Sequence, residues 1–247
     1  MKIIQITDLH IGRRGEETHQ VDVRSNFLNI LAEVKFANAD HLVVSGDLCY
    51  MDGTKSTYNW IKARLARLRI PYEVISGNHD STPLMKEVFE LDHLGKGDEL
   101  YYARKIGKWT CLFLDSSRGH HSKNQLKWLK RQLHNANHDL IIFMHHPPAK
   151  AGVPFMDNKH ALQDIEAVQE ILFDCPHNIT IFCGHYHVEK TVRIKNLLIQ
   201  ITPSTYFQID QTSPEFKIDH HRIALREIHL NGKSVETTVR YFDGNKM

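Results

Sequence analysis

Aspartate, histidine and asparagine gather in five short clusters along the chain, and their side chains could bind metal ions. The clusters are Asp8-Leu9-His10, Gly46-Asp47, Gly77-Asn78-His79-Asp80, His145-His146-Pro147 and Gly184-His185-Tyr186-His187. Carboxylate, imidazole and amide groups together suit divalent ions such as manganese, iron or zinc. Two ions about 4 Å apart need one shared carboxylate and further ligands for each ion. The five clusters hold enough ligands for such a pair.

The seven candidate ligands divide into two sets that share Asp47. Asp8, His10 and His187 complete the first set, and Asn78, His145 and His185 complete the second. A glycine precedes Asp47, Asn78 and His185. Glycine allows the backbone to approach closely at the sharp turns where these ligands would lie.

The hydrophobic pattern predicts the elements that must carry the clusters. Apolar runs predict strands over 2–6, 41–44, 72–75, 100–103, 109–114, 140–144 and 179–183, and over 191–194, 197–201, 206–209, 222–228 and 235–241. Helical spacing predicts helices over 21–37, 58–68, 125–133 and 162–173. Each cluster follows a predicted strand. Because ligands bind at the carboxyl ends of strands in open α/β sheets, we expect the clusters to meet at one edge.

The composition is that of an ordinary globular chain. Its 247 residues are 41% hydrophobic and 24% charged, with a formal net charge of +2. These values exclude a disordered chain, a collagen-like repeat and a membrane bundle. The balance of charge argues against a long nucleic acid as partner. We find no linker and no fixed repeat, and we expect a single domain over residues 1–247.

Each cluster taken alone also fits a structural role. The segment 77–80 fits a turn before a helix that starts at Ser81 or Thr82, and prolines could simply end the strand before residues 145–148. Cys175, His177, Cys183 and His185 offer an alternative structural zinc site. The 18 histidines exceed an even share of the twenty residue types. The five clusters together, each after an apolar run, favour a metal site over a set of unrelated turns.

In this order, the five clusters resemble those of the calcineurin-like metallophosphoesterase family, from residue 2 to about residue 210. The resemblance implies a four-layer α/β/β/α sandwich, in which two mixed β-sheets are flanked by helices. It implies a metal-dependent phosphoric diester hydrolase with two metal ions (Mn, Fe or Zn), bound by the seven ligands above. It also implies that Asp47 bridges the ions and that His79 acts beside them without binding them.

A further stretch is similar to one branch of this family. Thr202-Pro203-Ser204-Thr205, the block Gly46-Asp47-Leu48 and the compact length resemble the bacterial class III cyclic-nucleotide phosphodiesterases. This branch implies hydrolysis of 3′,5′-cyclic AMP to 5′-AMP. Many family members carry a second aspartate where this chain has Tyr50, which weakens the comparison with the protein-phosphatase branch.

His79 and Asp80 are the predicted catalytic residues. In this chemistry, two metal ions lower the pKa of a bridging water and neutralise the phosphoryl charge. His79 is expected to donate a hydrogen bond to a phosphoryl oxygen or to protonate the leaving group. Asp80 either orients the ring of His79 or caps the helix that follows.

The predicted substrate contacts are Asn78, His79, His146, Arg13 and Thr205. Arg13 and Arg14 either contact phosphate or lie in solvent. His120 and His121 are further candidates near the substrate. Tyr206 either stacks on a base or packs in the core.

Three functions stay open from the sequence. The first is the phosphodiesterase, and the second is the same chemistry on a glycerophosphodiester, a phosphomonoester or a nucleic-acid end. The third is a non-catalytic metal-binding scaffold, against which the intact ligand set argues. The apolar start is too short for a signal peptide and the four cysteines fit reduced thiols, so we expect a cytoplasmic protein without membrane contact. Related branches often dimerise, which makes a homodimer a further expectation.

Overall fold

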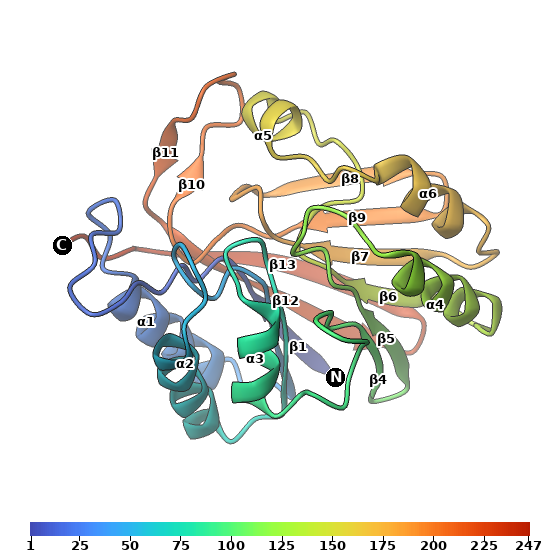
Figure 1. Cartoon of the computed structure of the whole chain (residues 1–247), viewed down its shortest axis with the longest axis horizontal. Helices are drawn as coiled ribbons and strands as arrows, with labels where there is room; N and C mark the ends of the chain where they lie inside the picture. Colours follow the sequence, from blue (N-terminus) through green and yellow to red (C-terminus); the bar gives the residue numbers. More distant parts are fainter.

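The computed structural model describes residues 1–247, and its main strands form two sheets (Figure 1). The first sheet has the order β13-β12-β1-β2-β3. Its strands are β1 (Lys2–Ile6), β2 (His41–Ser45), β3 (Tyr72–Ile75), β12 (Ile223–Asn231) and β13 (Ser234–Phe242). β1, β2 and β3 are parallel, whereas β12 runs antiparallel to both β1 and β13. This sheet therefore joins the first and the last strands of the chain.

The second sheet has the order β4-β5-β6-β7-β9-β8. Its strands are β4 (Tyr102–Ile106), β5 (Trp109–Phe113), β6 (Leu140–Phe143), β7 (Ile179–Cys183), β8 (Lys190–Ile194) and β9 (Leu197–Ile201). The four inner strands are parallel, and the edge strands β4 and β8 are antiparallel to their neighbours. Both sheets are therefore mixed, as predicted.

Helices cover the outer faces of the paired sheets. α1 (Val23–Phe36), α2 (Lys55–Leu68) and α3 (Thr82–Phe89) lie on one side, and α4 (Lys123–His134) and α6 (Ile165–Phe173) on the other (Figure 1). α1, predicted over 21–37, buries a stripe formed by Phe27, Ile30, Leu31 and Val34. The four-layer α/β/β/α arrangement is confirmed. No helix combines the length and hydropathy that a bilayer crossing needs.

A buried polar network joins the two sheets inside the core. Gln5 on β1 donates from Nε2 to the carbonyl of Cys183 on β7 (3.2 Å), and its Oε1 accepts from Thr202 (2.6 Å). Arg226 on β12 donates to Thr202 (2.8 Å) and to the carbonyl of Ile201 on β9 (3.0 Å). Because these groups are buried, their hydrogen bonds offset the cost of removing them from water and fix how the sheets sit on each other.

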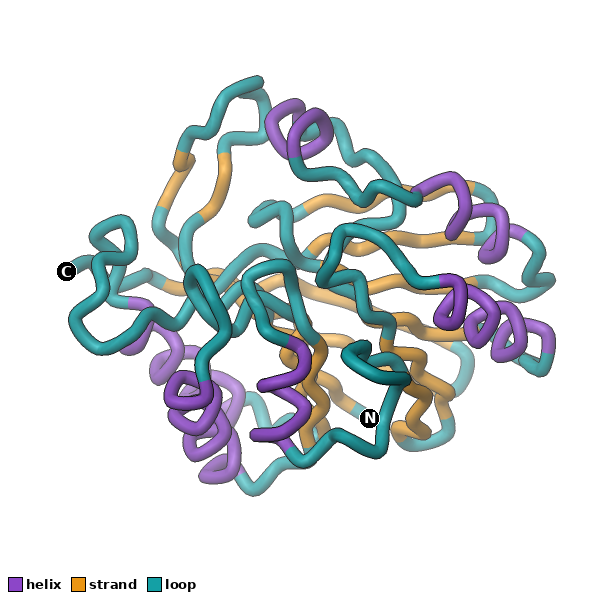
Figure 2. Tube along the Cα trace, viewed as in Figure 1, coloured by secondary structure: helices purple, strands orange, loops and turns teal.

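A two-stranded arm stands apart from the main sheets, beside the short helix α5 (Pro154–Lys159) (Figures 1 and 2). It pairs β10 (Gln208–Ile209) with β11 (Ile218–His220). Of the strand predicted over 206–209, only Gln208 and Ile209 form a strand. Tyr206 and Phe207 precede it and line a cavity described below. α5 and β11 were not predicted as elements, and α3 was expected only as the helix that could follow the turn at residues 77–80.

The first strand of the second sheet also differs from the prediction. A strand over 100–103 was expected, but β4 begins at Tyr102. The N–H of Leu100 instead donates to the carboxylate of Asp115 (2.8 Å), which holds this segment in a loop. A turn at Gly107 and Lys108 connects β4 to β5.

Candidate metal centre

The carboxyl ends of strands from both sheets bring the five clusters together. In the first sheet, Asp8, Asp47 and Asn78 follow β1, β2 and β3; in the second, His145 and His185 follow β6 and β7. Backbone hydrogen bonds link neighbouring clusters, since the N–H of Asp8 donates to the carbonyl of Gly46 and that of Gly184 donates to the carbonyl of His145 (both 3.0 Å). The structure therefore places the predicted clusters at one edge of the paired sheets.

The backbone of the clusters is left-handed at five of these residues. The φ angles are 54° at Asp8, 46° at His10, 49° at Asp47, 68° at His185 and 51° at His187. Such angles are uncommon for residues with a Cβ, and they concentrate at functional sites. The surrounding hydrogen bonds must therefore hold the chain in this shape.

Two glycines leave room for the carboxylates. A Cβ atom at Gly77 would collide with the side chain and the backbone of Asp47. A Cβ atom at Gly184 would collide with the Thr7 hydroxyl and lie 2.6 Å from Oδ2 of Asp8. The glycines of these clusters are therefore required by close approach.

Three side chains form the first half of the site. Ligand atoms of Asp8, His10 and His187 all lie within 4.8 Å of one another. Oδ1 of Asp8 is 3.3 Å from Nε2 of His187, and the Nε2 atoms of His10 and His187 are 3.1 Å apart. All three residues are buried. This half uses three of the four ligands predicted for the first ion.

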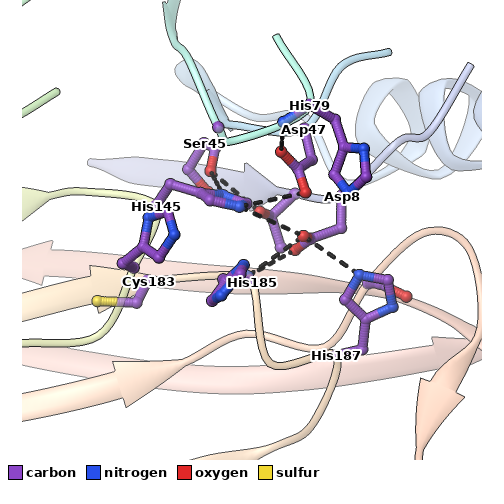
Figure 3. A network of polar contacts seen from close by, with 12 residues as sticks. Asp8, Ser45, Asp47, His79, His145, Cys183, His185 and His187 are labelled. Carbon is purple, nitrogen blue, oxygen red and sulfur yellow. Dashed lines mark hydrogen bonds and ion pairs between the residues drawn. The ribbon is translucent and has the colours of Figure 1, made fainter. Parts of the chain in front are cut away.

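Three other side chains form the second half (Figure 3). Ligand atoms of Asp47, His145 and His185 also lie within 4.8 Å of one another. Oδ2 of Asp47 is 3.3 Å from Nε2 of His145 and 3.7 Å from Nε2 of His10. Asp47 therefore lies between the two halves, where a shared ligand is expected.

Backbone carbonyls orient three of the imidazoles. Nδ1 of His145 contacts the carbonyl of Ser45 (3.0 Å), and Nδ1 of His187 contacts that of Phe207 (2.9 Å). Nε2 of His185 contacts the carbonyl of His160 (2.9 Å). Because a carbonyl only accepts, each contacting nitrogen carries the hydrogen, and the other nitrogen of the neutral ring keeps a lone pair for a metal.

The donor set fits metal ions. Nε2 of His145 and Nδ1 of His10 are buried without a hydrogen-bond partner, although buried polar atoms are normally paired. Two buried carboxylates and four imidazoles face one another, and this chemistry suits divalent cations. The residues present therefore fit a pair of metal ions.

Burial and mutual charge shift the pKa values of these groups. Burial raises the pKa of Asp8, but His187 and His145 outweigh it and lower the value to about 2. Burial likewise opposes the effect of His145 on Asp47, whose pKa falls well below its usual range. Burial lowers the pKa of His10 and of His185 to about 3. These carboxylates are thus ionised and these two imidazoles neutral near pH 7, which are the forms that bind metals.

His145 has the opposite shift. Burial lowers its pKa, but the charges of Asp47 and Asp8 outweigh burial and raise the value to about 9. Without a metal, the ring of His145 thus carries a proton and a positive charge beside two carboxylates. A bound metal ion would replace this proton, since an imidazole must lose it to become a ligand.

His79 lies at the rim of the cluster. Its backbone N–H donates to Oδ1 of Asp47 (2.9 Å), and its Nδ1 is 3.3 Å from the carbonyl of Met51. Its ring centroid is 5.1 Å from that of His10, and a ligand atom of His79 lies within 4.8 Å of those of His10 and Asp47. The ring therefore reaches the centre from its edge (Figure 3).

Asp80 does neither of the two things predicted for it. Its carboxylate accepts from the backbone N–H groups of Gly77 (2.9 Å), Leu48 (3.0 Å) and Cys49 (3.1 Å), and from the hydroxyl of Tyr58 (3.1 Å). It does not contact the His79 ring, which is held by a carbonyl, and the residue at the N-cap of α3 is Ser81. Asp80 instead ties the loop after β2 to the loop after β3.

Three of the predicted substrate contacts lie outside the lining of the cavity beside the centre. Nδ1 of His146 contacts the hydroxyl of Ser116 (3.0 Å), and its ring packs 4.0 Å from that of His185. The hydroxyl of buried Thr205 donates to the carbonyl of Asp8 (3.3 Å). Arg13 is exposed and lies outside the cavity lining. The buried two contact ligand residues, and Arg13 lies in solvent, which is one of the two alternatives given for it. Their contact with substrate stays a prediction.

A cavity of about 420 Å³ opens beside the centre. Asn78 and His79 line it together with ligand side chains, and Asn78 is exposed there. Tyr206 lines it too although it is only 2% exposed, with its ring 4.9 Å from that of His10. The remaining lining residues include several that the sequence analysis missed, namely His19, Met51, Phe155, His160, Phe207 and Phe216. They are single residues from separate segments, so no motif marked them.

The other histidines named as candidates lie elsewhere. His120 is exposed and contacts the carbonyl of Arg118. His121 is buried against Asp164, whose carboxylate is 3.1 Å from its Nδ1. Neither residue lines the cavity.

Comparison with known proteins places the chain among phosphoesterases. A family model described as calcineurin-like phosphoesterase matches residues 1–189. The chain is 34% identical over 242 residues to a "probable cyclic nucleotide phosphodiesterase" of Fibrobacter succinogenes, which covers 98% of this chain and 94% of the relative. It is 27% identical over 248 residues to the 3′,5′-cyclic adenosine monophosphate phosphodiesterase CpdA of Escherichia coli (96% and 88% covered).

Two further comparisons broaden this result. The chain is 28% identical over 220 residues to a "probable glycerophosphodiester phosphodiesterase GpdQ" of Arcobacter nitrofigilis, with 85% of this chain and 80% of the relative covered. Among solved structures, a dimetal phosphatase from Danio rerio matches with a TM-score of 0.74 at 14% identity, covering 99% of this chain and 97% of that one. At this identity, the structural likeness concerns the fold.

Proposed function

The chain belongs to the calcineurin-like phosphoesterase family and is a metal-dependent phosphoester hydrolase, and we propose that it hydrolyses 3′,5′-cyclic AMP to 5′-AMP. The proposal rests chiefly on the two buried ligand clusters, one with Asp8, His10 and His187 and the other with Asp47, His145 and His185. Residues of both clusters line one cavity of about 420 Å³. Such a cavity is large enough for a small phosphodiester.

The proposed ligands are those of the sequence analysis. Asp8, His10, Asp47 and His187 bind one ion, and Asp47, Asn78, His145 and His185 bind the other. The short distances within each cluster and the carbonyl-held imidazoles support this assignment. We propose manganese, iron or zinc as the metals, because all three accept mixed oxygen and nitrogen ligands.

The bound ions would supply a hydroxide at neutral pH and positive charge against the phosphoryl oxygens. In the proposed reaction, an oxygen from water bonds to phosphorus while the bond from phosphorus to the 3′ oxygen breaks. His79 protonates the departing 3′ oxygen. In the imidazolium form, its Nδ1–H donates to the carbonyl of Met51 (3.3 Å), which leaves Nε2–H for the substrate.

A glycerophosphodiester is the second candidate substrate. It is favoured by the similarity to the GpdQ relative, which covers 85% of this chain. The cyclic-nucleotide relatives cover 98% and 96%, and so extend over more of the chain. The reaction chemistry is the same for both substrates, and the difference lies in the part of the cavity beyond the phosphate.

The test is a turnover panel with the manganese-loaded protein. The substrates are cyclic AMP, cyclic GMP, a bis-aryl phosphodiester, glycerophosphoethanolamine and a mono-aryl phosphate. We expect cyclic AMP to give the highest kcat/KM. Highest turnover of the glycerophosphodiester would favour the second candidate, and cleavage of the monoester alone would contradict both. Full metal occupancy without any turnover would indicate a scaffold.

Two further predictions belong to the whole protein. A cytoplasmic location is consistent with the four cysteines, which are all unpaired and buried. A homodimer also stays a prediction, and the mass of the protein in solution tests it.

A further inference from the structure

Two large apolar side chains are exposed together at the cavity beside the centre. Met51 is 57% exposed and Phe216 is 45% exposed, and both line the cavity. Exposed apolar groups that gather at a concave site are typical of ligand binding. Phe216 is the more informative of the two, because it belongs to a group of aromatic rings.

Three phenylalanine rings from separate segments lie next to one another at tilted or edge-on angles and are here called the aromatic wall. Phe207 is the most buried of them, at 5% exposed. The ring of Phe216 lies 5.7 Å from that of Phe155 and 5.8 Å from that of Phe207, measured between centroids. All three residues line the cavity. The wall therefore forms one apolar side of a cavity whose floor is polar.

The aromatic wall adjoins the metal centre at both ends. The ring of Phe207 is 5.3 Å from that of His187, whose Nδ1 also contacts the carbonyl of Phe207. The ring of Phe155 is 5.0 Å from that of His160, whose carbonyl is bonded to His185. A group attached to a phosphate at the centre can therefore reach the wall.

Polar contacts hold the arm that carries Phe216 in place. The carboxylate of Asp210 accepts from the N–H of Thr212 (2.9 Å) and from Nζ of Lys217 (2.7 Å). Nζ of Lys159, the last residue of α5, contacts Oε2 of Glu215 at 2.8 Å and so connects α5 to the arm. The arm lies beside α5 (Figure 1), and these contacts accompany the 5.7 Å approach of the Phe216 ring to that of Phe155.

We propose that the aromatic wall binds a flat ring on the ester group of the substrate, and that Phe216 is a specificity-determining residue. The proposal rests on the proposed phosphodiesterase function and narrows it to diesters that carry a nucleobase or an aryl group. Moving such a ring out of water costs little free energy, and stacking it on phenyl rings is favourable. The hydroxyls of a glycerol group would find no hydrogen-bond partner on the three phenyl rings, which makes glycerol esters poor occupants.

The test measures binding of monoesters to the manganese-loaded protein by calorimetry. The ligands are 5′-AMP, phenyl phosphate, glycerol 3-phosphate and inorganic phosphate. We expect the two ring-bearing ligands to bind about 10-fold more tightly than glycerol 3-phosphate, as one stacked ring contributes. Tighter binding of 5′-AMP identifies a nucleobase as the occupant, and tighter binding of phenyl phosphate identifies an aryl group.

Variants assign the effect to Phe216. Phe216→Ala is expected to weaken the binding of the two ring-bearing ligands about 10-fold. The affinities for glycerol 3-phosphate and inorganic phosphate should change by less than about twofold. Phe216→Tyr should restore the difference, because it keeps a ring. Phe36→Ala is the matched control, since Phe36 is 77% exposed at the end of α1 and lies outside the cavity.

Several outcomes would overturn the proposal. They are equal weakening of all four ligands by Phe216→Ala, unchanged binding of the ring-bearing ligands, or no preference for them in the wild type. Because the binding assay needs no turnover, failure of the proposed function can be distinguished from failure of the aromatic wall. A protein that shows the ring preference but cleaves no diester refutes the phosphodiesterase alone, whereas one that cleaves diesters without this preference refutes the aromatic wall alone.

Discussion

The ring of His79 meets the metal centre only at its edge, so metal binding and catalysis can be separated there. Its N–H to Asp47 comes from the backbone and survives a change of side chain. We expect His79→Ala to keep both metals and to lose about 10²–10⁴-fold in kcat, the usual contribution of an acid catalyst. Metal analysis alongside turnover checks this. A variant that loses metal would show His79 to be a ligand, which the close contact with His10 also allows.

Asp47 and Asp8 differ in how many ions they would hold. Asp47 lies 3.7 Å from His10 and 3.3 Å from His145, and Asp8 also lies 3.8 Å from His145. Asp47, however, shares one three-residue group of ligand atoms with His10 and another with His145, whereas Asp8 shares only the group with His10 and His187. Asp47→Ala should therefore lower the metal content toward zero, and Asp8→Ala should lower it toward one ion per chain. Metal analysis after dialysis measures both variants. Equal loss in the two variants would contradict the shared role of Asp47.

Asp80 has a structural role that its position in the motif conceals. Asp80→Ala would leave three backbone N–H groups and the hydroxyl of Tyr58 without their acceptor. We expect the free energy of unfolding to fall by about 3 kcal/mol, because buried donors are costly to leave unpaired. Urea denaturation measures this. Asp52→Ala is the control, since Asp52 is exposed nearby and should change stability little; equal stability of Asp80→Ala would refute the role.

For single residues, type and spacing predict which residues lie at the site better than they predict what each side chain does there. The clusters were found because aspartate and histidine follow strands in a fixed order. Most partners of Asp80 are backbone N–H groups, which nearly every residue has, so residue type does not identify them. Thr205 and His146 are near the site as expected, but the direction of a side chain depends on loop conformation, which spacing does not encode.

The turns that follow the strands are the elements on which the centre depends. Gly184 ends β7 against Thr7 and Asp8, where a Cβ has no room. Gly184→Ala should therefore displace the carboxylate of Asp8 and lower metal affinity at least about tenfold, as one lost or displaced ligand does. Gly152→Ala is the control: Gly152 has a φ of 72° but open space around it, so alanine there adds backbone strain alone. Equal metal affinity in both variants would contradict the steric argument.

Elements with strong periodicity were predicted, and short ones were not. β2 and β7 are mostly apolar and buried, and α1 has a regular buried stripe. The arm has strands of only two and three residues, and α5 has six residues. Such elements are too short to show a period and are held by specific contacts, such as those of Asp210, which only the folded chain reveals.

For the whole molecule, the centre connects the two sheets. Asp8 and Asp47 extend from the first sheet, and His145 and His185 from the second. Bound metals should therefore stabilise both sheets together. We expect manganese at about 1,000 times its Kd to raise the free energy of unfolding by about 4 kcal/mol over the chelated protein.

Hydrogen exchange tests this connection. Amides of β1 and β2 and those of β6 and β7 should gain protection together when metal is added. A gain confined to one sheet would show that the metals belong to that sheet alone. The buried contacts of Arg226 contain no proposed ligand and should persist in both states.

The left-handed backbone at the centre has a consequence for how the sequence can vary. Five of the cluster residues have φ between 46° and 68°. Aspartate, asparagine and histidine are the non-glycine residues that accept such angles most readily, and they are also the residues that donate oxygen and nitrogen to metals. The backbone conformation and metal coordination thus favour the same few residue types. A library randomised at these five positions and sorted for folding alone should already be enriched in metal-binding residues.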